Sequence, residues 1–125
     1  MRWTRWGSCT PRPMRERTYR MWLALEAEDP DRAVSVAQDV QPERHPFPSI
    51  RVLYWVNYGR ALARLRGRQD DAVRALRTAE DIFSTKVRRD PIVRETLTEL
   101  LPRTRRDSPA GQELHAMAYR AGLPV

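Results

Sequence analysis

Residues 54–82, with the sequence YWVNYGRALARLRGRQDDAVRALRTAEDI, decide the fold of this chain. Apolar and small residues recur at helical spacing on both sides of a turn that opens at Gly67. Before the turn they are Trp55, Tyr58, Gly59 and Leu62, and after it Ala72, Val73, Leu76 and Ala79. The small residues Gly59, Ala63 and Ala72 allow two helices to approach closely, while the larger ones fill the seam. The stretch therefore predicts a helix-turn-helix unit that buries its apolar face by stacking on neighbouring units.

Capping residues and prolines predict further helices. Three dipeptides combine an N-cap side chain with a proline that suits the first helical turn: Asp29-Pro30, Asp90-Pro91 and Ser108-Pro109. Residues 41–48 contain three prolines and predict a rigid loop, and Gly122 fits the C-terminal cap of the last helix. These signals predict six helices, over residues 14–28, 29–40, 49–65, 70–83, 90–101 and 108–121. No segment shows the alternating pattern of a strand.

Length and composition favour one small folded domain. The chain has 125 residues, of which 41% are apolar, and it contains four Trp. No apolar run approaches the roughly 20 residues needed to span a bilayer, and the basic N-terminus lacks the apolar segment of a secretory signal. The lone Cys9 fits a reducing compartment. We therefore expect a cytoplasmic protein without membrane association.

A weak internal repeat supports a stack of helix pairs. Residues 24–34 align without gaps on residues 63–73 at an offset of 39, within the range of helical-pair repeats. The spacing of the apolar and small residues in 54–82 resembles that of tetratricopeptide repeats, with one extra residue in the turn before Ala72. The first unit has Arg20 where that pattern places a small residue. We expect an all-α, right-handed stack of about six antiparallel helices, tetratricopeptide-like, over residues 14–125.

Residues 22–125 resemble the C-terminal half of actinobacterial Xre-type helix-turn-helix transcriptional regulators. The resemblance lies in the order of four segments, residues 23–33, 59–80, 88–101 and 113–124, which are similar to family patterns such as "GRALA..R.R.DDAV.AL..AE" and "EL..MA.RAGLP". It implies a sensing or dimerising module. Such regulators carry a DNA-reading domain ahead of this region, and we expect this chain to lack it because only about 20 residues precede the first helix pair.

We find no catalytic or metal-binding motif and expect no enzyme activity and no cofactor. His45 and His115 lie far apart in the sequence and lack the spacing of metal ligands. We therefore expect His45 mainly to form hydrogen bonds within its loop. Helix capping explains Asp70 and Asp71 better than acid–base chemistry does. Ser8 beside Cys9 has no neighbouring base.

The helix over 49–65 offers a candidate site for a partner. Packing in the repeat is the dominant role for its aromatic residues. The functional alternative is a groove lined by Tyr54, Asn57, Arg60 and Arg64, which follow one side of the helix and would present donors to the backbone or carboxylate of a peptide. The predicted partner is a peptide, a protein or a second copy of the chain.

Arginine-mediated binding of nucleic acid is the alternative function. The net charge is +7, and Lys86 is the only Lys. The basic clusters are Arg64/Arg66/Arg68, Arg88/Arg89 and Arg103/Arg105/Arg106. All lie near predicted helix ends, where arginine complements the helix dipole, and acids are interspersed among them. We therefore expect nucleic acid to be bound only weakly or through a partner.

Residues 1–13 predict an irregular basic arm with Trp3 and Trp6 between arginines. The missing DNA-reading domain would leave an apolar face at the N-terminal end of the stack, because terminal repeats need a polar outer side. Trp3, Trp6 and Trp22, or dimerisation, would cover that face.

Overall fold

The structure, a computed structural model, describes residues 12–125 and is built from helices alone over that range. The α-helices are α2 (Arg12–Glu26), α3 (Pro30–Ala37), α4 (Pro48–Ala63), α5 (Gln69–Ile82), α6 (Ser84–Arg89), α7 (Pro91–Leu100) and α8 (Pro109–Arg120). Two short 3-10 helices cover Pro42–Arg44 and Leu101–Arg103. No described helix has the length and apolar character needed to cross a membrane. The predicted all-α helical stack is confirmed.

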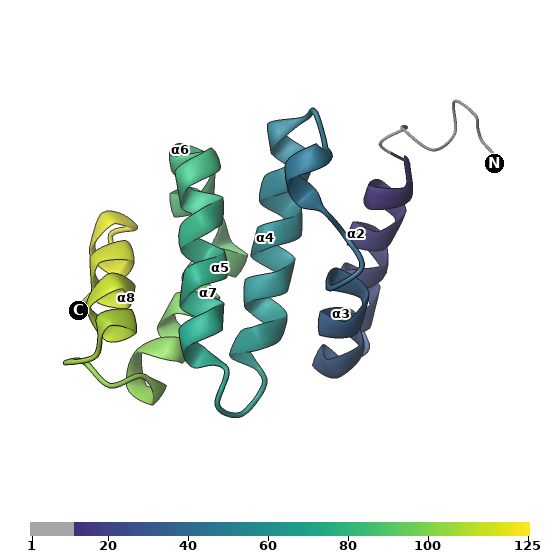
Figure 1. Cartoon of the computed structure of the whole chain (residues 1–125). Helices are drawn as coiled ribbons and strands as arrows, with labels where there is room; N and C mark the ends of the chain where they lie inside the picture. Colours follow the sequence, from purple (N-terminus) through teal and green to yellow (C-terminus); the bar gives the residue numbers. More distant parts are fainter. Residues whose placement is uncertain (1–11) are drawn as a thin grey trace.

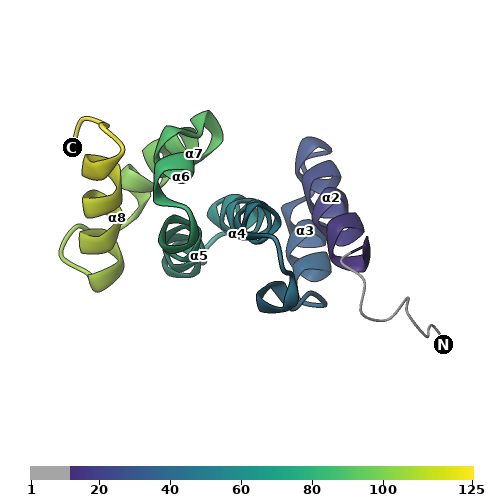
Figure 2. The same cartoon turned by 90° about the horizontal axis from the view of Figure 1, so that it is seen from above.

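Helix α4 lies at the centre of the stack (Figure 1). Its largest contact is with α5, and it also contacts α2, α3 and α7. Seen from above, α4 and α5 occupy the middle, with α2 and α3 on one side and α6, α7 and α8 on the other (Figure 2). Helix α8 packs on both α5 and α7. Residues 12–125 therefore form three successive helix pairs, with α6 inserted before the third.

The core lies mainly between α4 and α5. Gly59 faces Leu76 so closely that a Cβ atom at position 59 would meet the Leu76 side chain at 2.9 Å. Ala63 and Ala72 are buried at the same seam. The close approach predicted from these small residues is confirmed. Residue 59 must remain glycine for α4 and α5 to keep this distance.

The predicted helix signals agree with the observed caps at three places. The Asp29 and Asp90 carboxylates accept hydrogen bonds from the backbone N–H groups of residues 32 and 92, at 3.1 and 2.9 Å. The Ser108 hydroxyl accepts one from the N–H of Gly111 at 3.0 Å. The capping role predicted for Asp70 and Asp71 is wrong, because the N-cap of α5 is Arg68. Both acids lie in the first turn of α5, where they complement the helix dipole.

Helix α6 was not predicted from the sequence. Only Val87 of its six residues is buried, so no apolar periodicity marks it. Its last turn carries Lys86, Arg88 and Arg89, which complement the helix C-terminus. At the N-terminal end, α2 begins at Arg12, so the predicted irregular arm gives way to helix slightly before residue 14. Residues 1–11 of that arm lie outside the described residues.

The 39-residue repeat has a conformational counterpart. At that offset Glu28 corresponds to Gly67, and both adopt the left-handed conformation, with φ of 59° and 75°. Asp29 corresponds to Arg68, and both are N-caps. Glu28 closes α2. Its N–H donates to the carbonyl of Leu25 at 3.0 Å, and the N–H of Asp29 donates to the carbonyl of Ala24 at 2.8 Å. This bonding pattern usually has glycine at the left-handed position.

We predict that Glu28→Gly raises the free energy of unfolding by about 0.5–1 kcal/mol. The left-handed conformation costs a residue with a Cβ about 1–2 kcal/mol, and the greater freedom of glycine in the unfolded chain offsets part of the gain. Urea unfolding at neutral pH measures the change. Ala27→Gly is the matched control, because residue 27 has no positive φ and should lose stability. A Glu28→Gly variant less stable than the wild type would contradict the prediction.

Candidate functional site

The four residues predicted to line a groove all lie on α4, but the structure divides them. Tyr54 is buried, and its hydroxyl donates a hydrogen bond of 2.8 Å to the carbonyl of Ala37 in α3. Burial, together with the nearby Tyr58 and Glu43, raises the pKa of Tyr54 to about 12, so the hydroxyl stays protonated. Tyr54 therefore fastens α4 to α3. It is not placed to contact a peptide.

Asn57 is also buried, with 2% of its surface exposed. Its Nδ2 has no hydrogen-bond partner among the residues that the structure describes. A buried amide without a partner costs free energy, so this position is a weak point of the packing around α4. Like Tyr54, Asn57 lies in the interior and away from the depression described below.

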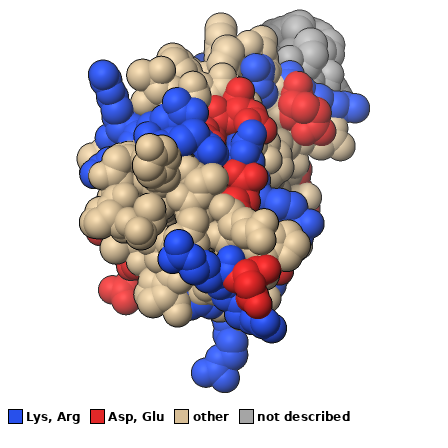
Figure 3. Space-filling view, turned by 90° about the vertical axis from the view of Figure 1, so that its left-hand side faces the viewer, with Lys and Arg blue, Asp and Glu red and all other residues tan. Residues whose placement is uncertain are grey.

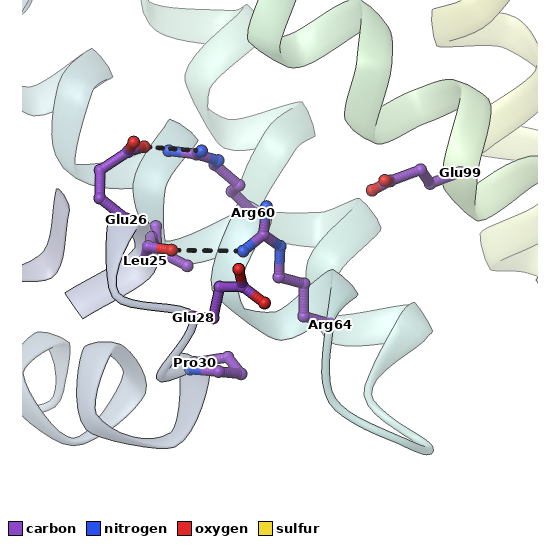
Figure 4. Close-up of a pocket in the computed structure, with 7 residues that line it drawn as sticks. All are labelled: Leu25, Glu26, Glu28, Pro30, Arg60, Arg64 and Glu99. Carbon is purple, nitrogen blue, oxygen red and sulfur yellow. Dashed lines mark hydrogen bonds and ion pairs between the residues drawn. The ribbon is translucent and has the colours of Figure 1, made fainter. Parts of the chain in front are cut away.

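Arg60 and Arg64 come together on the surface, one turn apart. Arg60 Nη2 donates to Glu26 Oε2 at 3.1 Å across the seam to α2, and 11% of its side chain is exposed. Its Nη1 is buried without a partner among the described residues. Arg64 Nη1 donates to the carbonyl of Leu25 at 3.3 Å, and Arg64 as a whole is exposed. Both line an open depression of about 600 Å³ (Figure 4).

Three acids complete the charged lining of this depression, and the sequence analysis did not find them. Glu26 ends α2, Glu28 lies in the turn that follows it, and Glu99 reaches toward the depression from α7 (Figure 4). Leu25 and Pro30 supply the apolar part. Glu28 and Glu99 make no ion pair within the described part of the chain. The depression therefore presents fixed charges of both signs.

Several arginines of the basic clusters form hydrogen bonds within the protein. Arg103 Nη1 donates to the carbonyl of Ala63 at the end of α4, at 2.6 Å, and Arg64 donates to the end of α2. Arg94 donates in the same way to the carbonyl of Ala121, which caps α8. Arg64 and Arg103 of the clusters therefore bind C-terminal carbonyls of helices, and Arg94, which belongs to no cluster, does the same. Each arginine binds the end of a neighbouring helix and not of its own helix, and the sequence did not predict these pairings.

His45 is a structural loop residue, as predicted. Its Nδ1 accepts a hydrogen bond from the N–H of Phe47 at 3.1 Å, and its carbonyl accepts one from Arg51 at 2.6 Å. Burial and the charges of Arg15 and Arg51 lower the pKa of His45, which favours the neutral ring. Within residues 12–125, no group of three or more His, Cys, Asp or Glu side chains is placed to hold a metal ion. Ser8 and Cys9 lie outside the described residues.

Helix α2 exposes apolar side chains at the N-terminal end of the stack. Tyr19, Trp22 and Leu23 are 59%, 37% and 44% exposed, and the two aromatic rings stack with centroids 5.7 Å apart. Trp3 and Trp6, which were predicted to cover this face together with Trp22, lie outside the described residues. Coverage of the face by dimerisation stays a prediction.

No family model, no curated protein and no solved structure matches the chain. The resemblance to tetratricopeptide repeats and to Xre-type regulators therefore stays a prediction from the residues that carry it.

Proposed function

We propose that this chain is a non-catalytic interaction module that binds a peptide segment carrying both a carboxylate and a basic group. The binding site is the depression between α2, α4 and α7. The observation that carries the proposal is the mixed lining, in which exposed Arg64 shares the depression with the unpaired carboxylates Glu28 and Glu99. In a regulator of the Xre type, such a module would sense a partner protein or join two copies of the chain.

The charges of the lining select the ligand. Arg60 and Glu26 neutralise each other at 3.1 Å, so Arg64, Glu28 and Glu99 remain to meet a ligand. Arg64 uses one nitrogen for the Leu25 carbonyl and keeps other donors of its guanidinium, which suit a carboxylate. Glu28 and Glu99 would accept hydrogen bonds from a lysine, an arginine or an amino terminus. A segment with neighbouring charges of opposite sign satisfies all three groups.

The shape of the site favours a peptide over a small metabolite. The depression is open, and it lies where α2, α4 and α7, the first helices of three successive pairs, meet. Stacks of helix pairs present extended surfaces of this kind to their partners. A backbone crossing from α2 to α7 would place an acidic side chain on Arg64 and basic ones on Glu28 and Glu99.

Nucleic-acid binding has less support. Many arginines already pair with carboxylates: Arg17, Arg60, Arg68, Arg74, Arg77, Arg88, Arg105 and Arg120. The interspersed acids reduce the attraction for a phosphate backbone. The surface charges therefore favour a partner that carries charges of both signs.

We predict that Arg64→Glu weakens binding of a cognate peptide by at least about tenfold. A hydrogen bond to a charged group contributes about 1.5–3 kcal/mol, and the reversed charge adds repulsion. Peptides would be selected from a random displayed library on the wild-type protein, and their affinities measured by fluorescence anisotropy. We expect the selected peptides to carry an acid and a base close together.

Arg66→Glu is the matched control. Arg66 lies two residues from Arg64, is exposed and does not line the depression. It should leave the affinity within about twofold, because an isolated surface charge contributes little. Replacing the peptide's acid with lysine should restore binding to the Arg64→Glu variant. The proposal fails if the library yields no binding peptide, or if both substitutions reduce the affinity equally.

A further inference from the structure

A second depression lies at the C-terminal end of the stack, between α6, α7 and α8. It measures about 410 Å³, and all of its charged lining residues are basic: Arg88, Arg89, Arg94 and Arg120. Thr85 and Ala121 complete the lining. Seen from the α8 end, basic side chains gather near the top of the molecule beside a smaller acidic area (Figure 3). This site is separate from the depression around Arg64.

One buried carboxylate lies next to this cluster. Glu80 of α5 is 4% exposed and accepts hydrogen bonds from Arg120 Nη2 at 2.7 Å and Arg120 Nε at 3.0 Å. It also accepts one from Arg88 Nε at 3.0 Å. Arg120 Nη2 is also 3.3 Å from Glu113, a carboxylate that Arg77 holds at 2.6 Å. Of the arginines that line the depression, only Arg88 and Arg120 therefore pair with a carboxylate.

The other two arginines have no carboxylate. Arg94 donates to the neutral carbonyl of Ala121, and the side chain of Arg89 makes no ion pair or hydrogen bond within residues 12–125. Arginines near the ends of α6 and α8 complement the helix dipoles, which explains part of this arrangement. A dipole end amounts to only about half a unit charge, however, so the dipoles do not balance four arginines around one depression.

The arginines of this depression keep unused hydrogen-bond donors, and their side chains are already ordered. Arg88 uses only its Nε, and Arg94 only one terminal nitrogen, in the contacts within the described chain. Because Glu80 holds Arg88 and Arg120 while Ala121 holds Arg94, three of the four guanidinium groups are already positioned. A ligand that meets fixed donors loses less entropy on binding.

We infer that this depression binds the phosphate group of a small ligand, either free phosphate or a phosphate monoester. The two arginines without a carboxylate match the charge of about −1.5 to −2 that a phosphate monoester carries at neutral pH. Planar guanidinium groups bind phosphate oxygens through paired hydrogen bonds. The volume lies in the lower part of the range for small-molecule sites.

The test is a titration of the full chain with sodium phosphate and, separately, with ribose 5-phosphate. Ionic strength is held constant with sodium chloride, so general screening does not change. NMR of the arginine Nε–H groups and of the backbone amides of α6 and α8 follows binding. We expect saturable shifts confined to these elements. Binding of both probes identifies a monoester site, and binding of inorganic phosphate alone identifies a site for the free ion.

Two substitutions on α6 provide the matched pair. Arg89→Ala should weaken binding about tenfold, because it removes a charged donor from the lining without breaking an internal contact. Lys86→Ala removes the same charge from the same helix but lies outside the lining, and it should change the affinity by less than about twofold. Thermal unfolding checks that both variants stay folded. Equal losses in the two variants, or no saturation up to about 10 mM of either probe, would overturn the inference.

Discussion

Glu80→Gln is expected to lower the free energy of unfolding by about 3 kcal/mol at neutral pH. Removing one partner of a buried ion pair typically costs about 3–5 kcal/mol, since the remaining charge is left without compensation. The side chains of Arg88 and Arg120 are 38% and 31% exposed, so water partly solvates them and the loss lies at the lower end of that range. Urea unfolding followed by circular dichroism measures the change.

The size of this effect follows from the position of Glu80. Its carboxylate joins three elements, because it lies on α5 and binds Arg88 of α6 and Arg120 of α8. Glutamine keeps the shape of the side chain but replaces one accepting oxygen with an NH₂ group, which opposes the donors of an arginine. The contacts of α6 and α8 with α5 should therefore loosen together.

The same substitution should reduce the loss of stability in acid. Burial alone would raise the pKa of Glu80, but hydrogen bonds from Arg120 and Arg88 outweigh it and hold the pKa below 4.5. A carboxylate with a lowered folded-state pKa contributes stability above its unfolded-state pKa and loses it as the pH falls through the folded-state value. The wild type should thus lose its advantage over Glu80→Gln as the pH falls below the ordinary glutamate pKa and through the lower folded-state pKa.

Glu95→Gln is the control for this experiment. Glu95 is exposed on α7 and makes no ion pair among the described residues, so its substitution should change the stability by no more than about 0.5 kcal/mol at any pH. A Glu80→Gln variant as stable as the wild type at neutral pH would show that the ion pairs with Arg88 and Arg120 do not hold α6 and α8 on α5.

The helices could be predicted from the sequence because their signals are local. Asp29, Asp90 and Ser108 each act within a few residues, and the face of α5 that packs on α4 follows from the spacing of Ala72, Leu76 and neighbouring residues. Helix α6 escaped prediction since one buried valine makes no period. Local rules therefore located the elements that carry a cap or an apolar stripe.

The candidate site was only half predictable, for a physical reason. Helix α4 has buried residues on all sides, so its sequence does not show which side faces solvent. Packing of α3 turned Tyr54 inward, while Arg60 and Arg64 stayed at the rim. The acids that complete the depression are far from Arg64 in the chain, as Glu80 is from Arg120. Such pairs come together only through tertiary packing, and no local spacing predicts them.

Gly111→Ala is the second substitution expected to have a large effect, with a net loss of about 2–3 kcal/mol. Gly111 is buried in the first turn of α8. A Cβ atom there would overlap the backbone carbonyl of Arg105 and come within 3.0 Å of the Cα of Arg106. Overpacking of this kind typically costs about 1–3 kcal/mol, with higher values where backbone must move, and the better helix propensity of alanine offsets up to about 1 kcal/mol.

The loop cannot easily move away from the new methyl group. The hydroxyl of Ser108 donates to the carbonyl of Arg105 at 2.7 Å, and the same hydroxyl accepts the N–H of Gly111. Shifting Arg105 would therefore break the N-cap of α8 as well, which adds about 1 kcal/mol. The clash and the cap act together, so α8 should detach from α5 and α7 before the rest of the stack unfolds.

Gly67→Ala separates this steric effect from the conformational role of glycine. Gly67 has a φ of 75° but open space around the position of a Cβ atom, so alanine there costs only the left-handed conformation, about 1 kcal/mol. Urea unfolding compares the two variants, and NMR shows whether the α8 amides shift selectively in Gly111→Ala. Because α8 carries Arg120, the Gly111→Ala variant should also lose the contacts of Glu80 across α5 and α8. Equal losses in the two glycine variants would mean that the backbone around Arg105 yields without cost, and that α8 is not held in place by its first turn.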